Sequence, residues 1–199
     1  MTPIVFDLEW NQPLKGRSAV PGLPDEIIQI GAAKIDLQGN VLDTFSQIIK
    51  PFYYTKLNKD VSELTLLTDA DLEGGLPFAG AMDAFRSWCG SDFVLLSWSG
   101  SDGHVLVRNC RKFDYPADWL PDLYDAQLMF DNYEMQEDRS WPLNYALYHF
   151  QEKPDGAHNA LADVLSTALV LKHLELEEAL KDEYFIYRKA GEAQGDEAE

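Results

Sequence analysis

The amino-acid sequence predicts an α/β fold in which a mixed, five-stranded sheet carries helices on both faces. Two strand-like segments, 26–36 and 41–49, are joined by a turn signal at residues 38–40, which predicts an antiparallel hairpin. Strand-like and helix-like segments then alternate from residue 77 onward, which is typical of parallel strands joined by helices. The first segment, 3–9, is apolar on both faces, as expected of a strand that helices cover from both sides.

The N-terminal part contains the first three strands and the loops around them. Residues 11–24 follow the first strand, and their three prolines and two glycines predict a loop. Pro51 ends the third strand. Residues 58–72 are polar, and we expect them to be helical in part.

The C-terminal part alternates between strands and helices. Residues 93–98 are expected to form the fourth strand, whereas 123–130 fit either a fifth strand or a helix. Pro142 is well placed as a first helical residue, and Gly90 as a helix stop. The expected helices cover residues 77–88, 104–112, 142–150 and 159–174.

The length of 199 residues fits one domain with a sizeable core. We expect this domain at residues 1–189, followed by an acidic, disordered tail at 190–199. The formal net charge is −18, with 34 acidic and 16 basic residues. This charge argues against broad electrostatic attraction to nucleic acid or to anionic membranes, but it leaves room for a local site in which bound cations draw in phosphate.

Several features together predict a cytoplasmic location. No apolar stretch approaches the ~18 residues that suggest a membrane span. A strand begins by residue 4 with no basic segment before it, so we expect no secretory signal. Cys89 and Cys110 lie far apart without metal-ligand spacing, and we expect two reduced thiols.

Two carboxylates in the first strand point to a metal site. Asp7 and Glu9 are two residues apart and therefore share one face of the strand. On a covered strand they repel each other and lose hydration, and a hard divalent cation with oxygen ligands would remove both penalties. The alternative interpretation is a strand end that emerges into solvent, where alternating acids are common.

Three further polar residues come from distant segments. Asp102 lies just beyond the carboxyl end of an apolar strand, although an Asp in such a turn is often only a helix cap. His158 and Asp163 surround the start of the last helix, with Asn159 as the expected cap. A loop histidine there suits a general base that takes a proton from an attacking water, whereas the alternative is an exposed histidine and a solvated acid.

Two tryptophans lie within a few residues of these acids. Trp10 follows Glu9 and Trp98 precedes Asp102, so either could stack on a terminal base of a nucleic acid. Packing in the core is the alternative interpretation for each.

These segments together resemble the DEDDh family of 3′–5′ exonucleases. The resemblance covers about residues 3–176. It rests on three motifs in order: Phe6-Asp7-Leu8-Glu9, the segment 97–102 ending at Asp102, and the segment 157–163 with His158 and Asp163 five residues apart. Residues 25–32 look like the family's second strand, and Glu63-Leu64-Thr65 looks like its substrate-side turn, which makes Thr65 a candidate substrate contact. Residues 7–13 and 88–90 look like the bacterial branch related to the sporulation-inhibitor (KapD-like) and enhancer-of-RNAi-type exonucleases.

The resemblance implies a ribonuclease H-like fold and a two-metal hydrolase. Asp7, Glu9, Asp102 and Asp163 would bind two divalent cations, Mg²⁺ or Mn²⁺, and His158 would be the general base. The implied substrate is the 3′ end of single-stranded RNA or DNA, which is shortened to nucleoside 5′-monophosphates.

Three positions depart from the family pattern. Leu66 stands where many relatives have glycine, Pro142 replaces a common serine, and Gly103-His104 after Asp102 is unusual. None of these departures removes a catalytic group, so they bear on substrate preference.

Two alternatives to an exonuclease remain open from the sequence. A regulatory binding protein on an exonuclease scaffold, with little or no activity, is motivated by the net charge of −18. The complete set of five candidate catalytic residues argues against it. An endonuclease of the same fold class is the second alternative, and it would cut circular single strands.

Overall fold

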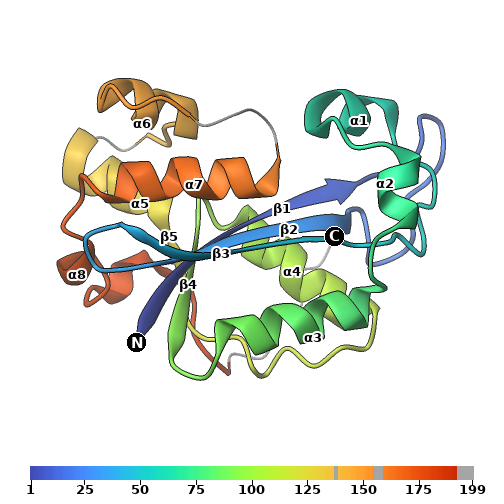
Figure 1. Cartoon of the computed structure of the whole chain (residues 1–199), viewed down its shortest axis with the longest axis horizontal. Coiled ribbons are helices and arrows are strands. Elements are labelled where there is room, and N and C mark those ends of the chain that lie inside the picture. The colour runs from blue at the N-terminus through green and yellow to red at the C-terminus, as the bar shows by residue number, and fades with distance from the viewer. Residues whose placement is uncertain (137–138, 155–158, 192–199) are drawn as a thin grey trace.

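The computed structural model describes residues 1–136, 139–154 and 159–191. Its centre is a six-stranded sheet in the order β3-β2-β1-β4-β5-β6 (Figure 1). β1, β2 and β3 pair antiparallel, β1, β4 and β5 pair parallel, and β6 pairs antiparallel with β5. The strands are β1 Thr2–Asn11, β2 Glu26–Ile35, β3 Val41–Ile48, β4 Phe93–Ser97, β5 Leu123–Asp125 and β6 Ile186–Arg188.

The mixed α/β architecture is therefore confirmed, and the predicted number of five strands is wrong by one. The additional strand, β6, has only three residues, so it is too short to show the alternation by which strands are found in a sequence. It is formed by pairing with β5, a contact between segments more than 60 residues apart.

Eight α-helices are present in the described residues. They are α1 Lys59–Thr65, α2 Asp69–Glu73, α3 Phe78–Cys89, α4 Ser101–Lys112, α5 Ala126–Phe130, α6 Leu143–His149, α7 Ala160–Leu171 and α8 Leu176–Ala179. A π-helical turn, Asp131–Met135, continues α5, and a 3₁₀ turn, Glu183–Phe185, precedes β6. Residues 123–130, for which the sequence fits either a strand or a helix, form both: strand β5 is followed directly by helix α5.

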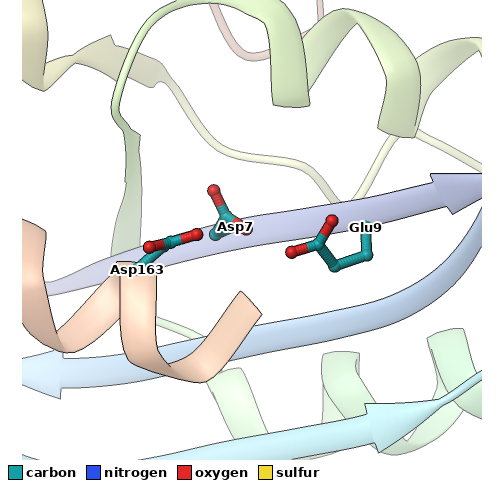
Figure 2. Close-up of side chains that lie close together, drawn as sticks. All are labelled: Asp7, Glu9 and Asp163. Carbon is teal, nitrogen blue, oxygen red and sulfur yellow. The ribbon is translucent and has the colours of Figure 1, made fainter. Parts of the chain in front are cut away.

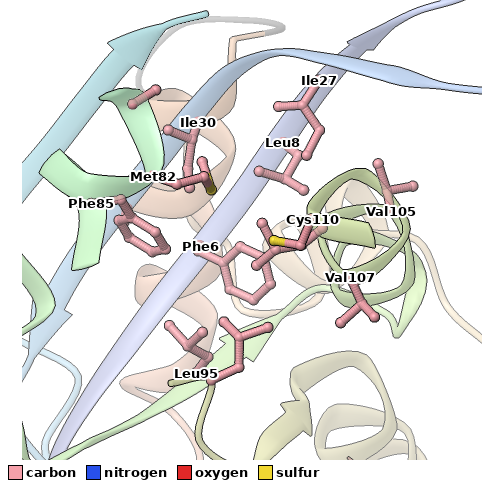
Figure 3. Close-up of a cluster of buried hydrophobic side chains, with 14 of the residues drawn as sticks. Phe6, Leu8, Ile27, Ile30, Met82, Phe85, Leu95, Val105, Val107 and Cys110 are labelled. Atoms are coloured by element: carbon pink, nitrogen blue, oxygen red, sulfur yellow. The ribbon is translucent and has the colours of Figure 1, made fainter. Parts of the chain in front are cut away.

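Helices cover both faces of the sheet, as the apolar first strand predicts. Ile4, Phe6 and Leu8 of β1 point to one face and pack with α3 and α4 (Figure 3). Val5 points to the other face and packs with Val164 of α7. β1 is thus central and buried on both sides, which fixes the direction of every side chain along it.

Gly31 of β2 lets helix α7 approach the sheet closely. A Cβ at Gly31 would overlap the backbone of Ala160 and Leu161, the first residues of α7. Glycine is the residue that permits such close contact between two backbones. The first turn of α7 is therefore seated directly on β2.

Cys89 and Cys110 are both buried as free thiols, and burial raises the pKa of each to about 12. Among the described residues, no helix combines the length and apolarity that crossing a membrane requires.

Candidate active site

Strand β1 presents two carboxylates on the face that α7 covers. The strand alternates, so Asp7 and Glu9 point to the same side as Val5 and away from the α3–α4 side. Asp163 points to them from the first turn of α7 (Figure 2). Asp7, Glu9 and Asp163 each offer a ligand atom, and these atoms lie within 4.8 Å of one another. The structure thus brings together three of the predicted metal ligands from two distant segments.

Asp102 lies beside this group at the start of α4, directly after strand β4. It is buried, and its Oδ1 accepts a hydrogen bond of 3.0 Å from the backbone N–H of Leu8. Leu8 is the residue between Asp7 and Glu9, so this bond ties the start of α4 to the acidic part of β1. Burial, followed by repulsion from Asp102, raises the pKa of Asp7.

The position of Asp163 follows from three contacts at the start of α7. The Asn159 side chain accepts the N–H of Ala162 at 3.0 Å, so Asn159 caps the helix as the sequence predicts. Gln29 Oε1 accepts the N–H of Ala160 at 3.4 Å, and Gly31 leaves room for the same turn. Both Gln29 and Gly31 lie opposite the acidic residues of β1 in the β1–β2 register.

Burial and mutual repulsion both disfavour the charged forms of these carboxylates. Desolvation, followed by repulsion from Asp102, Glu9 and Asp163, raises the pKa of Asp7 well above its usual value. Desolvation and repulsion from Asp163 raise the pKa of Glu9 to about 7. Desolvation raises the pKa of Asp102 to about 7, although the Leu8 N–H acts in the opposite direction. Bound positive charge would remove the repulsion.

The residues present fit a divalent cation. The donors are carboxylate oxygens from a strand and a helix, which are the ligands that hard ions such as Mg²⁺ and Mn²⁺ prefer. Burial and mutual repulsion raise the pKa values of Asp7 and Glu9, so a bound positive charge would stabilise their ionised forms. An acidic cluster that is closely spaced and largely desolvated is therefore suited to hold a divalent cation.

The remaining predicted residues occupy different places. His158, the candidate general base, lies outside the described residues. Trp10 is half-buried and packs against the core on the α3–α4 side, and Trp98 packs 5.9 Å from the ring of Phe130. Thr65, at the end of α1, is buried, and its hydroxyl donates to the Val61 carbonyl at 2.9 Å. Contact of these three residues with a nucleotide stays a prediction.

Leu66, the first departure from the family pattern, ends α1 in a left-handed conformation. Its φ is 60°, and its side chain is 74% exposed. A glycine adopts this conformation without strain, which explains why glycine suits the position. The leucine therefore places an exposed apolar side chain at the end of α1.

Tyr187 of β6 supports the start of α4, and no pattern in the sequence predicts this role. Its ring packs against Gly100 and Gly103, and its hydroxyl lies 3.3 Å from Ser97 Oγ. A Cβ at Gly103 would overlap the Tyr187 hydroxyl and would come within 2.8 Å of Cζ. Gly103, the unusual glycine after Asp102, thus leaves room for the side chain of Tyr187, which is 84 residues later in the sequence.

Comparison with known proteins places this arrangement in a family. The Exonuclease (RNase T) family model matches residues 4–171. The chain belongs to this family. The match spans β1 through α7, and so includes every described carboxylate of the site.

The curated relatives include the PolC-type DNA polymerase III of Streptococcus pyogenes. It is 29% identical over 171 residues, which cover 85% of this chain. The chain spans only about 11% of the length of that polymerase.

Solved structures with the same fold include two kinds of exonuclease. The nuclease domain of 3′hExo, a DEDDh family member bound to rAMP, has a TM-score of 0.78 at 19% identity, covering 89% of this chain and 93% of that one. Exonuclease I of E. coli in complex with a dT13 oligonucleotide has a TM-score of 0.68 at 20% identity, covering 86% and 40%. The likeness confirms the ribonuclease H-like fold, and with the family membership it supports a nuclease.

Proposed function

We propose that this protein is a DEDDh-type 3′–5′ exonuclease that hydrolyses single-stranded RNA or DNA to nucleoside 5′-monophosphates. The observation that carries the proposal is the convergence of Asp7, Glu9 and Asp163 within 4.8 Å, on the fold of the Exonuclease family. Asp102, tied to β1 through Leu8, supplies the fourth carboxylate. The KapD-like branch placement and a cytoplasmic location belong to the same proposal. The two buried free thiols support the latter.

The carboxylates would hold two divalent cations, Mg²⁺ or Mn²⁺. When bound, the cations supply Lewis-acid stabilisation of the negative charge that develops on the phosphate and on the leaving oxygen. Asp7 is central to the site, because repulsion from Asp102, Glu9 and Asp163 all acts on it. We therefore assign Asp7 the role of the ligand whose loss is most costly.

His158 is proposed as the general base. It accepts a proton from water while the water oxygen attacks the 3′-terminal phosphorus in line. The new P–O bond forms as the bond from phosphorus to the 3′ oxygen breaks. The leaving 3′ oxygen takes up a proton, and a nucleoside 5′-monophosphate departs. His158 directly precedes Asn159, the residue that caps α7, and Asp163 lies in the first turn of the same helix.

The proposed substrate is a single strand with a free 3′ end. The fold neighbours support this choice, since one is exonuclease I in complex with a dT13 oligonucleotide and another concerns 3′-end specific recognition of a histone mRNA stem-loop by a 3′-exonuclease. One neighbour carries DNA and the other RNA, so both polymers are candidate substrates. The net charge of −18 predicts modest affinity for long polyanions.

The test is degradation of 3′-labelled and 5′-labelled single-stranded RNA and DNA, with Mg²⁺ or Mn²⁺ against EDTA. We expect metal-dependent shortening from the 3′ end, complete loss in Asp7→Ala, and a large fall in turnover in His158→Ala with metal binding largely retained. Near-native turnover in His158→Ala would exclude the general-base role.

Two further outcomes separate the alternatives. Cleavage of a circular single strand would identify an endonuclease, because an exonuclease needs an end. Absence of any cleavage, with no stabilisation by Mg²⁺ or Ca²⁺ in thermal unfolding, would favour a regulatory binding protein on this scaffold.

A further inference from the structure

An aromatic groove lies on the side of the sheet opposite to α7. It has a volume of about 510 Å³ and is formed by the loop after β3, the start of α3 and the end of α4. We call it the Phe52 groove, and its principal lining residues are Lys50, Phe52, Tyr53, Phe78, Lys112 and Phe113. α3 and α4 pack on the sheet face that Phe6 and Leu8 share (Figure 3). Asp7 and Glu9 point to the other face, toward Asp163 of α7 (Figure 2).

The aromatic rings of the groove form a continuous chain of contacts. Phe78 and Phe113 stack with centroids 4.5 Å apart, and Tyr53 contacts Phe113 at 5.5 Å. Phe52 meets the ring of Tyr53 edge-on at 4.9 Å. Phe78 is buried, so it anchors the chain in the core, while Phe52 at the outer end is 72% exposed. The groove therefore presents the exposed ring of Phe52, which is supported by rings that pack against the core.

The backbone that carries the exposed ring is held by a buried carboxylate. Glu26, which is 1% exposed, accepts the N–H of Phe52 at 2.6 Å, of Tyr53 at 3.0 Å and of Tyr54 at 2.6 Å. Asn11 Nδ2 donates to the Tyr54 carbonyl at 2.8 Å. Because Phe52 is exposed, its ring adds little to the stability of the core. The loop that carries it is nevertheless held by at least four hydrogen bonds, including these. A preorganised contact surface explains both facts, because ordering it before binding lowers the cost of association.

Two lysines complement the rings. Lys50 lines the groove, and Lys112 Nζ lies 5.2 Å from the centroid of the Tyr53 ring and donates to the Pro21 carbonyl at 2.9 Å. Asp114 also lines the groove and could accept a hydrogen bond from an exocyclic amino group. A ligand that suits flat aromatic faces beside two cations is itself flat, aromatic and anionic. A nucleotide within a nucleic-acid strand has this chemistry.

We propose that the Phe52 groove binds a nucleotide of the substrate strand at a distance from the cleaved bond, with its base on Phe52 and its phosphate at Lys50 and Lys112. This inference rests on the proposed function and deepens it. The groove and the acidic site share one end of β1, since Asn11, which holds the Phe52 loop, is two residues beyond Glu9. A strand must therefore pass around this end of the sheet to engage both sites, and only a long strand can do so.

The test compares a trinucleotide with a single strand of about 20 nucleotides, which exceeds the length that one small domain usually covers. Affinity for the long strand is measured by fluorescence anisotropy in EDTA, and kcat and KM are measured for both lengths with Mg²⁺. The variants are Phe52→Ala and the double variant Lys50→Ala/Lys112→Ala. The matched controls are Tyr148→Ala, which removes a ring that is 79% exposed on α6, and Lys153→Ala, which removes another exposed lysine.

For Phe52→Ala we expect the Kd and KM of the long strand to rise about tenfold, as loss of one stacked base implies. The kcat and the KM of the trinucleotide should not change, and neither control should reproduce the effect. The lysine variant should weaken binding most at low salt, because it removes phosphate contacts. Affinities within twofold of wild type for both groove variants would overturn the proposal, and a groove for an aromatic peptide would then be the better reading. Failure to cleave the trinucleotide would count against the proposed function alone, since binding in EDTA is measured independently.

Discussion

At the scale of single residues, the position of Asp102 depends on the packing of Gly103 against Tyr187. Gly103 follows Asp102 in the first turn of α4, and the Tyr187 ring occupies the space where a side chain of residue 103 would lie. Burial raises the pKa of the Tyr187 hydroxyl well above its usual value, so this group stays neutral beside the acidic site. The small residue and the large one thus fill one volume between them, at the base of the helix that carries Asp102.

This complementarity predicts a coupled pair of substitutions. Gly103→Ala should lower the free energy of unfolding by about 1–3 kcal/mol, since its Cβ overlaps the Tyr187 hydroxyl. Tyr187→Ala should also destabilise, because it opens a cavity. The double variant should cost clearly less than the sum of the two, since the alanine at 103 enters the vacated space. Denaturant unfolding of the four proteins measures the coupling, and strict additivity would show that the two residues do not compete for one volume.

The contrast between Asp7 and Tyr187 shows which residues can be read from the sequence. Asp7 and Glu9 are predictable because a strand with apolar residues on both sides leaves them only one face to share. Asp102 follows a strand and Asp163 lies in a first helical turn, where acids are often only caps or solvated, so the family resemblance is what makes them candidates. Tyr187 belongs to a strand of three residues whose partner, β5, is equally short, and no local pattern encodes that pairing.

At the scale of elements, the seat of α7 on β2 places Asp163 opposite Asp7 and Glu9. Gly31 is the register partner of Asp7, and its missing side chain lets the first residues of α7 touch the sheet. Gln29, the partner of Glu9, accepts the N–H of Ala160. The same two positions of β2 therefore face the acids across the strand pair and also support the helix start.

Gly31→Ala should therefore affect the site more than an ordinary core substitution. The added methyl meets backbone atoms, which cannot rotate away, so we expect a loss of stability of about 1–3 kcal/mol and a weaker site for divalent cations. The measurement is thermal unfolding with and without Mg²⁺. Ala32→Gly, which removes a methyl from the neighbouring buried position, is the control. It should destabilise as well but leave the Mg²⁺-dependent shift intact, and an equal Mg²⁺-dependent shift in both variants would contradict the seating role of Gly31.

The three-residue strands β5 and β6 are the elements that the sequence did not predict clearly, and the reason is physical. β1, β2, α3 and α7 have ten residues or more, so their apolar periodicity predicts whether each is a strand or a helix and which side of it is buried. The segment 123–130 has too few residues for either period to show, and it divides into three residues of strand and five of helix. Its type is decided by the sheet, because Leu123 pairs with Leu95 of β4.

At the scale of the whole molecule, the acidic site is a local concentration of the charge that the entire chain carries. The net charge is −18, and three of the acids meet within 4.8 Å. Repulsion across the surface is screened by water and salt, whereas repulsion among partly buried carboxylates is screened much less. The site should therefore dominate the way in which pH and divalent cations change the stability of the protein.

The sign of that dependence follows from the raised pKa values. In the folded, metal-free protein the pKa values of Glu9 and Asp102 are about 7, whereas their ordinary values are 4.5 and 3.8. Between about pH 4 and 7 the folded state thus binds protons that the unfolded state has released. The stabilising contribution of these groups is complete below about pH 4 and is lost as the pH rises to about 7. We expect the free energy of unfolding in EDTA to fall over this range.

Mg²⁺ should flatten the fall, because it binds the ionised carboxylates of the folded state and not those of the unfolded chain. Asp7→Asn should be more stable than wild type near pH 7 in EDTA and should gain little from Mg²⁺, since it removes the buried carboxyl group whose ionisation is opposed by desolvation and by the other three acids. Asp118→Asn, at an exposed position, changes the net charge by the same amount and serves as the control. Denaturant unfolding across pH 4–8 measures all three proteins. If Asp118→Asn matched Asp7→Asn in EDTA, the pH dependence would belong to the overall charge and not to the site.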